Sequence, residues 1–171
     1  MNNEYANLTK IMKVPLRYIP KTLSKKDKLK QKKNLNKSRK LYKKGIYYSR
    51  PKVKSFVSKE SPHIQKLKKM YHVDSVSIPE LAKKTRCSEK SLNQIVKKGE
   101  GAYFSSGSRP NQTAHSWGFA RLASSLTGGN ASAIDYKELE EGCEPMSRPL
   151  VLAKKRCIKI GRNCGKTKKK L

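Results

Sequence analysis

Lys90, Asn93 and Gln94 are the residues whose types and spacing best suit a chemical task, the reading of nucleic acid. Asn and Gln side chains pair with adenine in the major groove, and Lys binds phosphate groups. The three residues lie in IPELAKKTRCSEKSLNQIV, residues 78–96, which resembles a helix-turn-helix. Arg86 occupies the turn position that glycine usually takes. Two interpretations stay open: a DNA-reading helix pair, or two short helices that pack as scaffold.

Arg109 is a second candidate for contact with an anion. It lies in the loop at residues 105–112, which leads into a helix that we expect to begin near Thr113. Free backbone amides at a helix start, together with a guanidinium, hold anions. The alternative is a connector that caps the helix.

Catalytic and metal-binding patterns find little support in the sequence. His115 and Ser116 are neighbours on a predicted helix and have no acid at a compatible spacing. Residues 161–167 imitate a phosphate-binding loop but lack one residue between the glycines. We therefore expect no enzymatic activity, no cofactor and no metal. We expect free thiols, because no C-x-x-C pair occurs and a cytosolic origin keeps cysteines reduced; the four are Cys87, Cys143, Cys157 and Cys164.

The positive charge of the chain is concentrated at its two ends. Residues 1–72 hold 22 Lys/Arg and 3 Asp/Glu, residues 143–171 hold 10 and 1, and residues 101–142 hold 3 and 4. Such ends repel themselves and have few apolar groups to bury, so we expect them to become ordered only against a partner. Nucleic acid, an anionic membrane and an acidic protein surface all match this charge.

The first basic arm, residues 1–60, carries the predicted anion-binding side chains. A capping pattern at Ser24 and Asp27 predicts a helix that ends near Lys44, and its leucines recur every six residues and so form no single stripe. We therefore expect a polar helix that does not pack within the chain. The segment 46–56 reads as a strand or as a base-stacking surface. The expected contacts are Lys25, Lys26, Lys28, Lys30, Lys32, Lys33, Arg39, Lys40, Lys43, Lys44, Arg50, Lys52 and Lys54.

The middle of the chain, residues 61–142, has the pattern of a small helical body. Capping residues and apolar residues at helical spacing predict helices from about 61, 77, 88, 113 and 132, the third of which ends at Gly99. Residues 143–171 form a basic tail in which residues 150–152 and 158–160 read as short strands. The fold class is therefore mainly α, with long basic arms and strand-like strips. The predicted core is Ile64, Leu67, Leu81, Leu92, Ile95, Trp117, Phe119, Leu122, Leu126 and Leu139.

One long block of sequence carries a family resemblance. GEGAYFSSGSRPNQTAHSWGFARLASSLTGGNASAIDY, residues 99–136, is similar to an uncharacterised basic protein family of nucleocytoplasmic large DNA viruses, including viruses of algae. The Lys-rich lead LSKKDKLKQKKNLNKSRKLYKKGIYYSRPKVKSF shares the resemblance, which covers about residues 14–143.

The resemblance implies a virion protein that is made in the host cytoplasm. We expect a non-enzymatic minor capsid protein that cements capsomers on the inner face of a large icosahedral shell. The implied partners are the major capsid protein, other minor capsid proteins and the anionic inner membrane, with no small-molecule substrate. The alternative is a nucleic-acid-binding protein that condenses or packages viral DNA, with Lys90, Asn93, Gln94 and Arg109 as its contacts.

Overall fold

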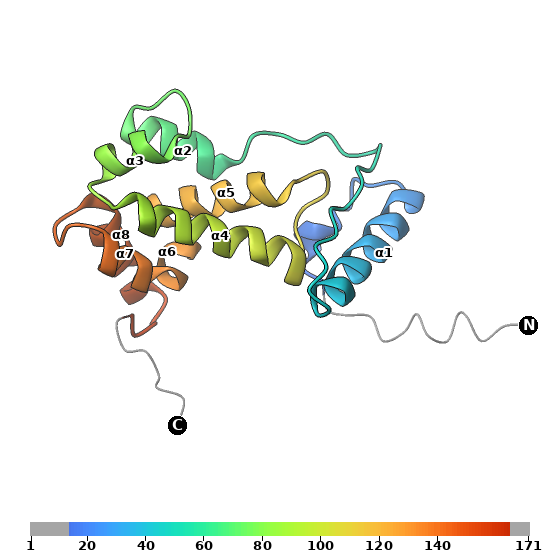
Figure 1. Ribbon diagram of the computed structural model, residues 1–171. Helices are drawn as coiled ribbons and strands as arrows, with labels where there is room; N and C mark the ends of the chain where they lie inside the picture. The colour runs from blue at the N-terminus through green and yellow to red at the C-terminus, as the bar shows by residue number, and fades with distance from the viewer. Residues whose placement is uncertain (1–13, 165–171) are drawn as a thin grey trace, which may run out of the picture. The chain divides into compact units, whose positions relative to one another are not determined.

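The protein is mainly helical over residues 14–164, which are the residues that the computed structural model describes (Figure 1). No strand occurs among these residues; Cys87 and Cys143 form an isolated bridge. The short 3-10 helix η2 (Leu16–Tyr18) comes first. The α-helices are α1 (Lys25–Tyr42), α2 (Pro62–Tyr71), α3 (Ile78–Thr85), α4 (Glu89–Ser105), α5 (Ala114–Leu126), α6 (Asn130–Ile134), α7 (Tyr136–Gly142) and α8 (Arg148–Lys159).

The chain divides into two units, which we describe separately. Unit 1 combines Met1–Ser58 with Ala102–Thr113, and unit 2 combines Lys59–Gly101 with Ala114–Leu171. This division differs from the three predicted segments in two ways. Residues 102–113 pack with the basic N-terminal segment, and the described part of the basic tail packs with the helical body. Residues 1–13 of the predicted arm and residues 165–171 of the predicted tail lie outside the described residues.

Helix α1 begins where its capping signal predicts. The Ser24 side chain accepts a hydrogen bond from the backbone N–H of Asp27 at 3.2 Å, which satisfies one free amide of the first turn. The helix ends at Tyr42, and Gly45 follows with a φ of +75°, a conformation that costs glycine little.

The expectation that α1 does not pack within the chain is wrong. One stripe of the helix is buried: Asp27, Gln31, Leu35 and Ser38. The spacing is that of one helical face, but three of the four side chains are polar, so the apolar pattern could not reveal it. Leu29, by contrast, is 57% exposed.

The centre of unit 1 is a buried arginine. The Arg50 guanidinium donates hydrogen bonds to Ser38 Oγ at 3.0 Å, to the Tyr103 carbonyl at 2.7 Å and to Ser108 Oγ at 2.7 Å. It also lies 3.7 Å from the centre of the Tyr103 ring. Burial lowers the pKa of Arg50 from its ordinary value. Arg50 therefore joins α1, the chain that follows it and the segment 102–113.

The segment that follows α1 is held without forming a strand, so the predicted strand at residues 46–56 is wrong. It runs back along α1 (Figure 1). Ser55 donates to Asp27 Oδ2 from its backbone N–H at 2.8 Å and from its hydroxyl at 2.6 Å. The Asn111 side chain accepts from the Val53 N–H and donates to the carbonyls of Val53 and Phe56. Side chains thus replace the backbone ladder of a sheet.

Unit 2 has an apolar core close to the predicted one. Helix α5 packs against α2, α6 and α8, and α8 also packs against α6 and α7. Trp117 is half-buried and lies outside the core cluster, so its assignment to the core is wrong, while Ile64 and Phe119 pack at the margin. The predicted residues that are fully buried are Leu67, Leu81, Leu92, Ile95, Leu122, Leu126 and Leu139.

Helix α4 continues past Gly99, where the sequence predicted its end. A Cβ atom at Gly99 would lie 2.6 Å from the Gly118 Cα, and one at Gly118 would lie 2.7 Å from the Val96 carbonyl oxygen. The two glycines therefore allow α4 and α5 to cross at close range. Gly99 serves this crossing and does not stop the helix.

Asp135 is buried in unit 2, although the sequence favoured a solvated acidic face. The Arg121 guanidinium donates to both of its carboxylate oxygens, at 2.9 and 2.7 Å, and Ser125 Oγ donates at 2.7 Å. Lys98 Nζ lies 3.3 Å from Asp135 and 2.7 Å from Glu138. This network links α4, α5 and the junction of α6 and α7.

The four cysteines are paired in the structure, so the expectation of free thiols is wrong. Cys87 bonds to Cys143, and Cys157 bonds to Cys164. The predicted strands at 150–152 and 158–160 are also wrong, because residues 148–159 form α8. Leu150, Ala153 and Cys157 are buried at helical spacing.

Among the residues that the structure describes, no helix combines the length and apolar character that crossing a bilayer needs.

Candidate anion-binding surfaces

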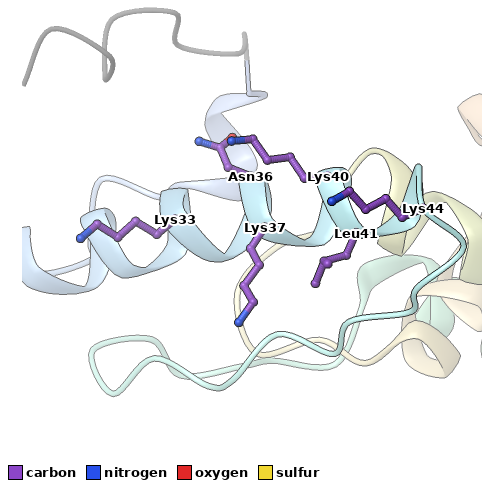
Figure 2. Close-up of a pocket in the computed structure, with 6 residues that line it drawn as sticks. All are labelled: Lys33, Asn36, Lys37, Lys40, Leu41 and Lys44. Atoms are coloured by element: carbon purple, nitrogen blue, oxygen red, sulfur yellow. The ribbon is translucent and has the colours of Figure 1, made fainter. Parts of the chain in front are cut away.

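The outward side of α1 carries a row of lysines, which we call the α1 stripe: Lys33, Lys37, Lys40 and Lys44. Their spacing places about one ammonium group on each helical turn. Together with Asn36 and Leu41 they line a hollow of about 400 Å³ (Figure 2). None of these six lining residues is acidic.

The lysines of the α1 stripe are not neutralised by an acidic residue of the same helix, because the only carboxylate of α1 is turned inward. Asp27 is buried and accepts hydrogen bonds from Ser55, and these bonds hold the pKa of Asp27 below its ordinary value. The C-terminal end of a helix carries a partial negative charge, which favours the cations near Lys44. The stripe is thus a fixed set of cations available to an anionic partner.

Most of the predicted arm residues lie on the surface of unit 1, but Arg50 does not. Its guanidinium is buried and forms its hydrogen bonds within unit 1, so its predicted role in binding a partner is wrong. Arg39 and Lys28 are half-buried, and Arg39 donates to the Ser106 carbonyl at 2.6 and 3.0 Å. The exposed ones are Lys25, Lys26, Lys30, Lys32, Lys33, Lys40, Lys43, Lys44, Lys52 and Lys54.

Lys37 was missed by the sequence reasoning. It lies four residues after Lys33 and three before Lys40, so helical spacing alone could have found it. Its Nζ lies 4.5 Å from the centre of the Tyr48 ring, a cation–π contact that holds the side chain over that ring.

The turn between α3 and α4 contains the left-handed residue that a helix-turn-helix has at this position. Arg86 takes the left-handed conformation, with φ +57° and ψ +41°. Its side chain forms an ion pair with Glu144 at 3.1 Å. Backbone hydrogen bonds from Ser88 to Gly142 (2.7 Å) and from Glu144 to Arg86 (3.0 Å) fasten the same turn, next to the disulfide at Cys87. These bonds stabilise the left-handed conformation of Arg86, which glycine adopts more readily than other residues.

The predicted nucleic-acid contacts of α4 share one exposed face. Lys90, Asn93 and Gln94 are exposed, and Lys97 continues the row one turn later; we call the four the α4 stripe. The sequence reasoning missed Lys97. Arg109 is exposed but belongs to unit 1, in the segment 102–113.

The cysteines and Asp135 have partners within the fold. Both cysteine pairs are disulfides, and Asp135 is bonded to Arg121. In the described ranges, no group of three or more His, Cys, Asp or Glu side chains is arranged to hold a metal ion. His115 lies 3.6 Å from Glu100 and packs beside Phe119.

The features above define a mainly α-helical, strongly basic protein with two lysine-bearing helical faces. The family of unknown function DUF5824 matches residues 15–139, which is most of the chain, so the chain belongs to that family. No curated protein and no solved structure matches it.

Proposed function

We propose that the protein is a non-enzymatic minor capsid protein, which cements capsomers on the inner face of a large icosahedral DNA virus shell. The observation that supports this role is the α1 stripe, which lies on a helix whose opposite face is packed within unit 1. A cationic face of this kind suits the acidic undersides of capsid proteins and the anionic inner membrane of such a virion.

The anchoring of α1 matters for the strength of binding. A lysine arm that is disordered when free loses conformational entropy when it binds, whereas a helix fixed by Arg50 and Leu35 loses only side-chain freedom. Each Lys held near an anionic membrane surface contributes about 1 kcal/mol. The four lysines of the α1 stripe therefore supply useful attraction without a folding cost.

The test compares two triple charge reversals in particles. The first variant is Lys33→Glu, Lys37→Glu and Lys40→Glu on the α1 stripe. The matched control is Lys59→Glu, Lys69→Glu and Lys154→Glu, three exposed lysines that belong to unit 2. We expect the first variant to be depleted at least about tenfold from purified particles, which corresponds to about 1.4 kcal/mol or more, and the control to be retained.

Location in the particle is the second readout. After gentle separation of shell and core, the chain should stay with the shell, and cross-linking on intact particles should join α1 lysines to capsid proteins. Normal incorporation of the α1 variant, or recovery of the chain with the genome, would contradict the proposal.

The second candidate function is binding and packaging of viral DNA, and the α4 stripe favours it. Asn93 and Gln94 have the side chains that pair with adenine, and Lys90 and Lys97 flank them on the same face. The left-handed turn at Arg86 supports this candidate, because a helix-turn-helix has such a turn before its recognition helix.

A titration with a 20-base-pair duplex separates the two ideas. If the α4 stripe reads DNA, the change Asn93→Ala with Gln94→Ala should abolish preference among duplex sequences, and Lys97→Ala should reduce the salt slope by about 1. Binding that shows no sequence preference and is weakened only by the α1 variant is generic charge attraction, and it would remove the second candidate.

A further inference from the structure

Unit 2 contains a hollow of about 580 Å³ that neither basic stripe includes. Three elements surround it: the first turns of α2, the turn between α5 and α6, and one side of α8. We call it the unit 2 hollow. Its lining residues are Pro62, His63, Lys66, Thr127, Gly128, Gly129, Leu152, Lys155, Arg156 and Lys159.

The lining of this hollow is cationic on two sides. Lys66 comes from α2, while Lys155, Arg156 and Lys159 come from α8, and no lining residue is acidic. Gathering four cations without a carboxylate raises the energy of the folded unit, because like charges repel. A bound anion would remove this repulsion and so stabilise unit 2.

Arg156 has a donor that the protein leaves unused. One terminal nitrogen of its guanidinium donates to Asn130 Oδ1, but its buried Nε has no hydrogen-bond partner among the described residues. A buried N–H without an acceptor costs about 1–3 kcal/mol. This Nε is itself buried, so contact with a ligand would come from the side of Arg156 that lines the hollow.

A glycine beside the hollow lets the turn between α5 and α6 pack closely against α8. Gly128 adopts a φ of +71°, and a Cβ atom there would lie 3.1 Å from the Leu152 Cβ. Lys66 Nζ donates to the carbonyl of the preceding Thr127 at 3.0 Å, which fixes one cation at the rim. The α2 helix directs its N-terminal end, with its partial positive charge, to the same hollow.

We propose that the unit 2 hollow binds a compact anion that carries phosphate groups. Phosphate oxygens accept hydrogen bonds in several directions, which suits donors that converge from two helices, and Arg with Lys is the usual pair of phosphate-binding side chains. The volume admits more than one phosphate group, so an oligophosphate or a phosphorylated headgroup fits. This proposal is independent of the capsid role, since it concerns another unit and other residues.

Tripolyphosphate is the probe, and the amides of Gly128 and Gly129 are the local reporters in nuclear magnetic resonance spectra of the full chain. We expect saturable shifts of both amides and a rise in the melting temperature at constant ionic strength. Lys155→Glu should weaken the affinity about tenfold or more, the factor that corresponds to about 1.4 kcal/mol. The matched control, Lys154→Glu, changes the charge of the same helix but does not line the hollow, and it should change the affinity less than about twofold.

Two further experiments identify the source of the phosphate and exclude unspecific attraction between the basic chain and any anion. Vesicles of phosphatidylcholine with and without phosphatidylinositol bisphosphate show whether a headgroup shifts the same two amides more strongly than the free anion does. The α1 variant used above should keep the response of Gly128 and Gly129, so failure of the capsid role leaves this test intact. No saturable shift of either amide, equal weakening by Lys154→Glu, or a response only to a DNA duplex would overturn the proposal.

Discussion

Unit 1 and unit 2 solve the same problem, folding a basic chain, in opposite ways. Unit 2 buries an apolar cluster between its helices and adds two disulfides. Unit 1 has few buried apolar side chains, and it arranges polar groups around Arg50. A lysine-rich segment can therefore be ordered by a satisfied hydrogen-bond network when its apolar content is too small for an ordinary core.

The two faces of α1 differ in the same way, one packing within unit 1 and the other carrying the exposed lysines. The inward stripe at Asp27, Gln31, Leu35 and Ser38 is polar, yet each polar member has a partner. The lysines of the α1 stripe thereby lie on the opposite face of the helix, where Lys37 also contacts the Tyr48 ring.

Arg50→Ala should have the largest effect. It leaves the Tyr103 carbonyl and two hydroxyls without their donor, and each buried polar group that is left unsatisfied costs about 1–3 kcal/mol. Hydrogen exchange should show loss of protection in α1 with retained protection in α5. Arg50→Lys should fail to rescue, because an ammonium group cannot reproduce the planar fork. The exposed neighbour Lys52→Ala is the control, and equal effects of Arg50→Ala and Lys52→Ala would refute the polar centre.

Two leucines of α1 test which side of the helix is packed. Leu35 is 1% exposed, and Leu35→Ala should lower the free energy of unfolding by about 2–5 kcal/mol. Leu29→Ala, at the exposed position, should change it by less than about 0.5 kcal/mol. Denaturant titrations of both variants measure the difference. Similar losses at the two positions would mean that the helix packs differently.

Reduction should weaken unit 2 selectively. Cys87 and Cys143 are 56 positions apart, and a crosslink over such a loop contributes about 2–4 kcal/mol. The pair Cys157→Ser with Cys164→Ser, separated by 7 positions, should cost about 1.7 kcal/mol less than the pair Cys87→Ser with Cys143→Ser. Melting curves of both double variants, and mass spectra after alkylation, measure this. Equal protection of unit 2 amides with and without reductant would argue against the pairing.

Acid should affect unit 1 through Asp27, by a smaller amount. Its pKa is lowered in the folded state by the hydrogen bonds from Ser55. The stabilisation is therefore complete above the unfolded pKa of about 3.9 and is lost as the pH falls through the folded value. Protection of α1 amides, measured relative to exchange of an unfolded chain at the same pH, should fall below about pH 4, and Asp27→Asn should flatten this dependence. Asp74→Asn, at an exposed position, is the control and should leave it in place.

Much of unit 2 could be predicted from sequence because its signals are local. The starts of α2, α3 and α4 follow from Ser61, Ser77 and Ser88, and the buried leucines fall at helical spacing. Helix α8 was mistaken for strands because Leu150, Val151 and Leu152 form a short apolar run, which helices and strands share. The buried residues of α8 are spaced three and four positions apart, as on one helical face: Leu150, Ala153 and Cys157.

Unit 1 could not be predicted in the same way, because its contacts are polar and distant in sequence. Arg50 meets Tyr103 and Ser108 more than fifty positions later, and no periodicity marks such a pairing. The disulfides escaped prediction for another reason, because free thiols were expected from a cytosolic origin and the absence of a C-x-x-C pair. Of the candidate surfaces, the exposed lysines and the α4 stripe follow from composition and helical spacing, whereas the unit 2 hollow requires three separated segments to be placed together.

The most direct test of this account is native-state hydrogen exchange on the purified full chain, alone in dilute buffer. The account predicts that amides of α1 around Leu35 are protected by a factor of about a thousand or more, without any anion or partner present. Exchange of those amides at the rate of an unfolded peptide, while α5 stays protected, would contradict it and would show that the basic segment is ordered only by a partner.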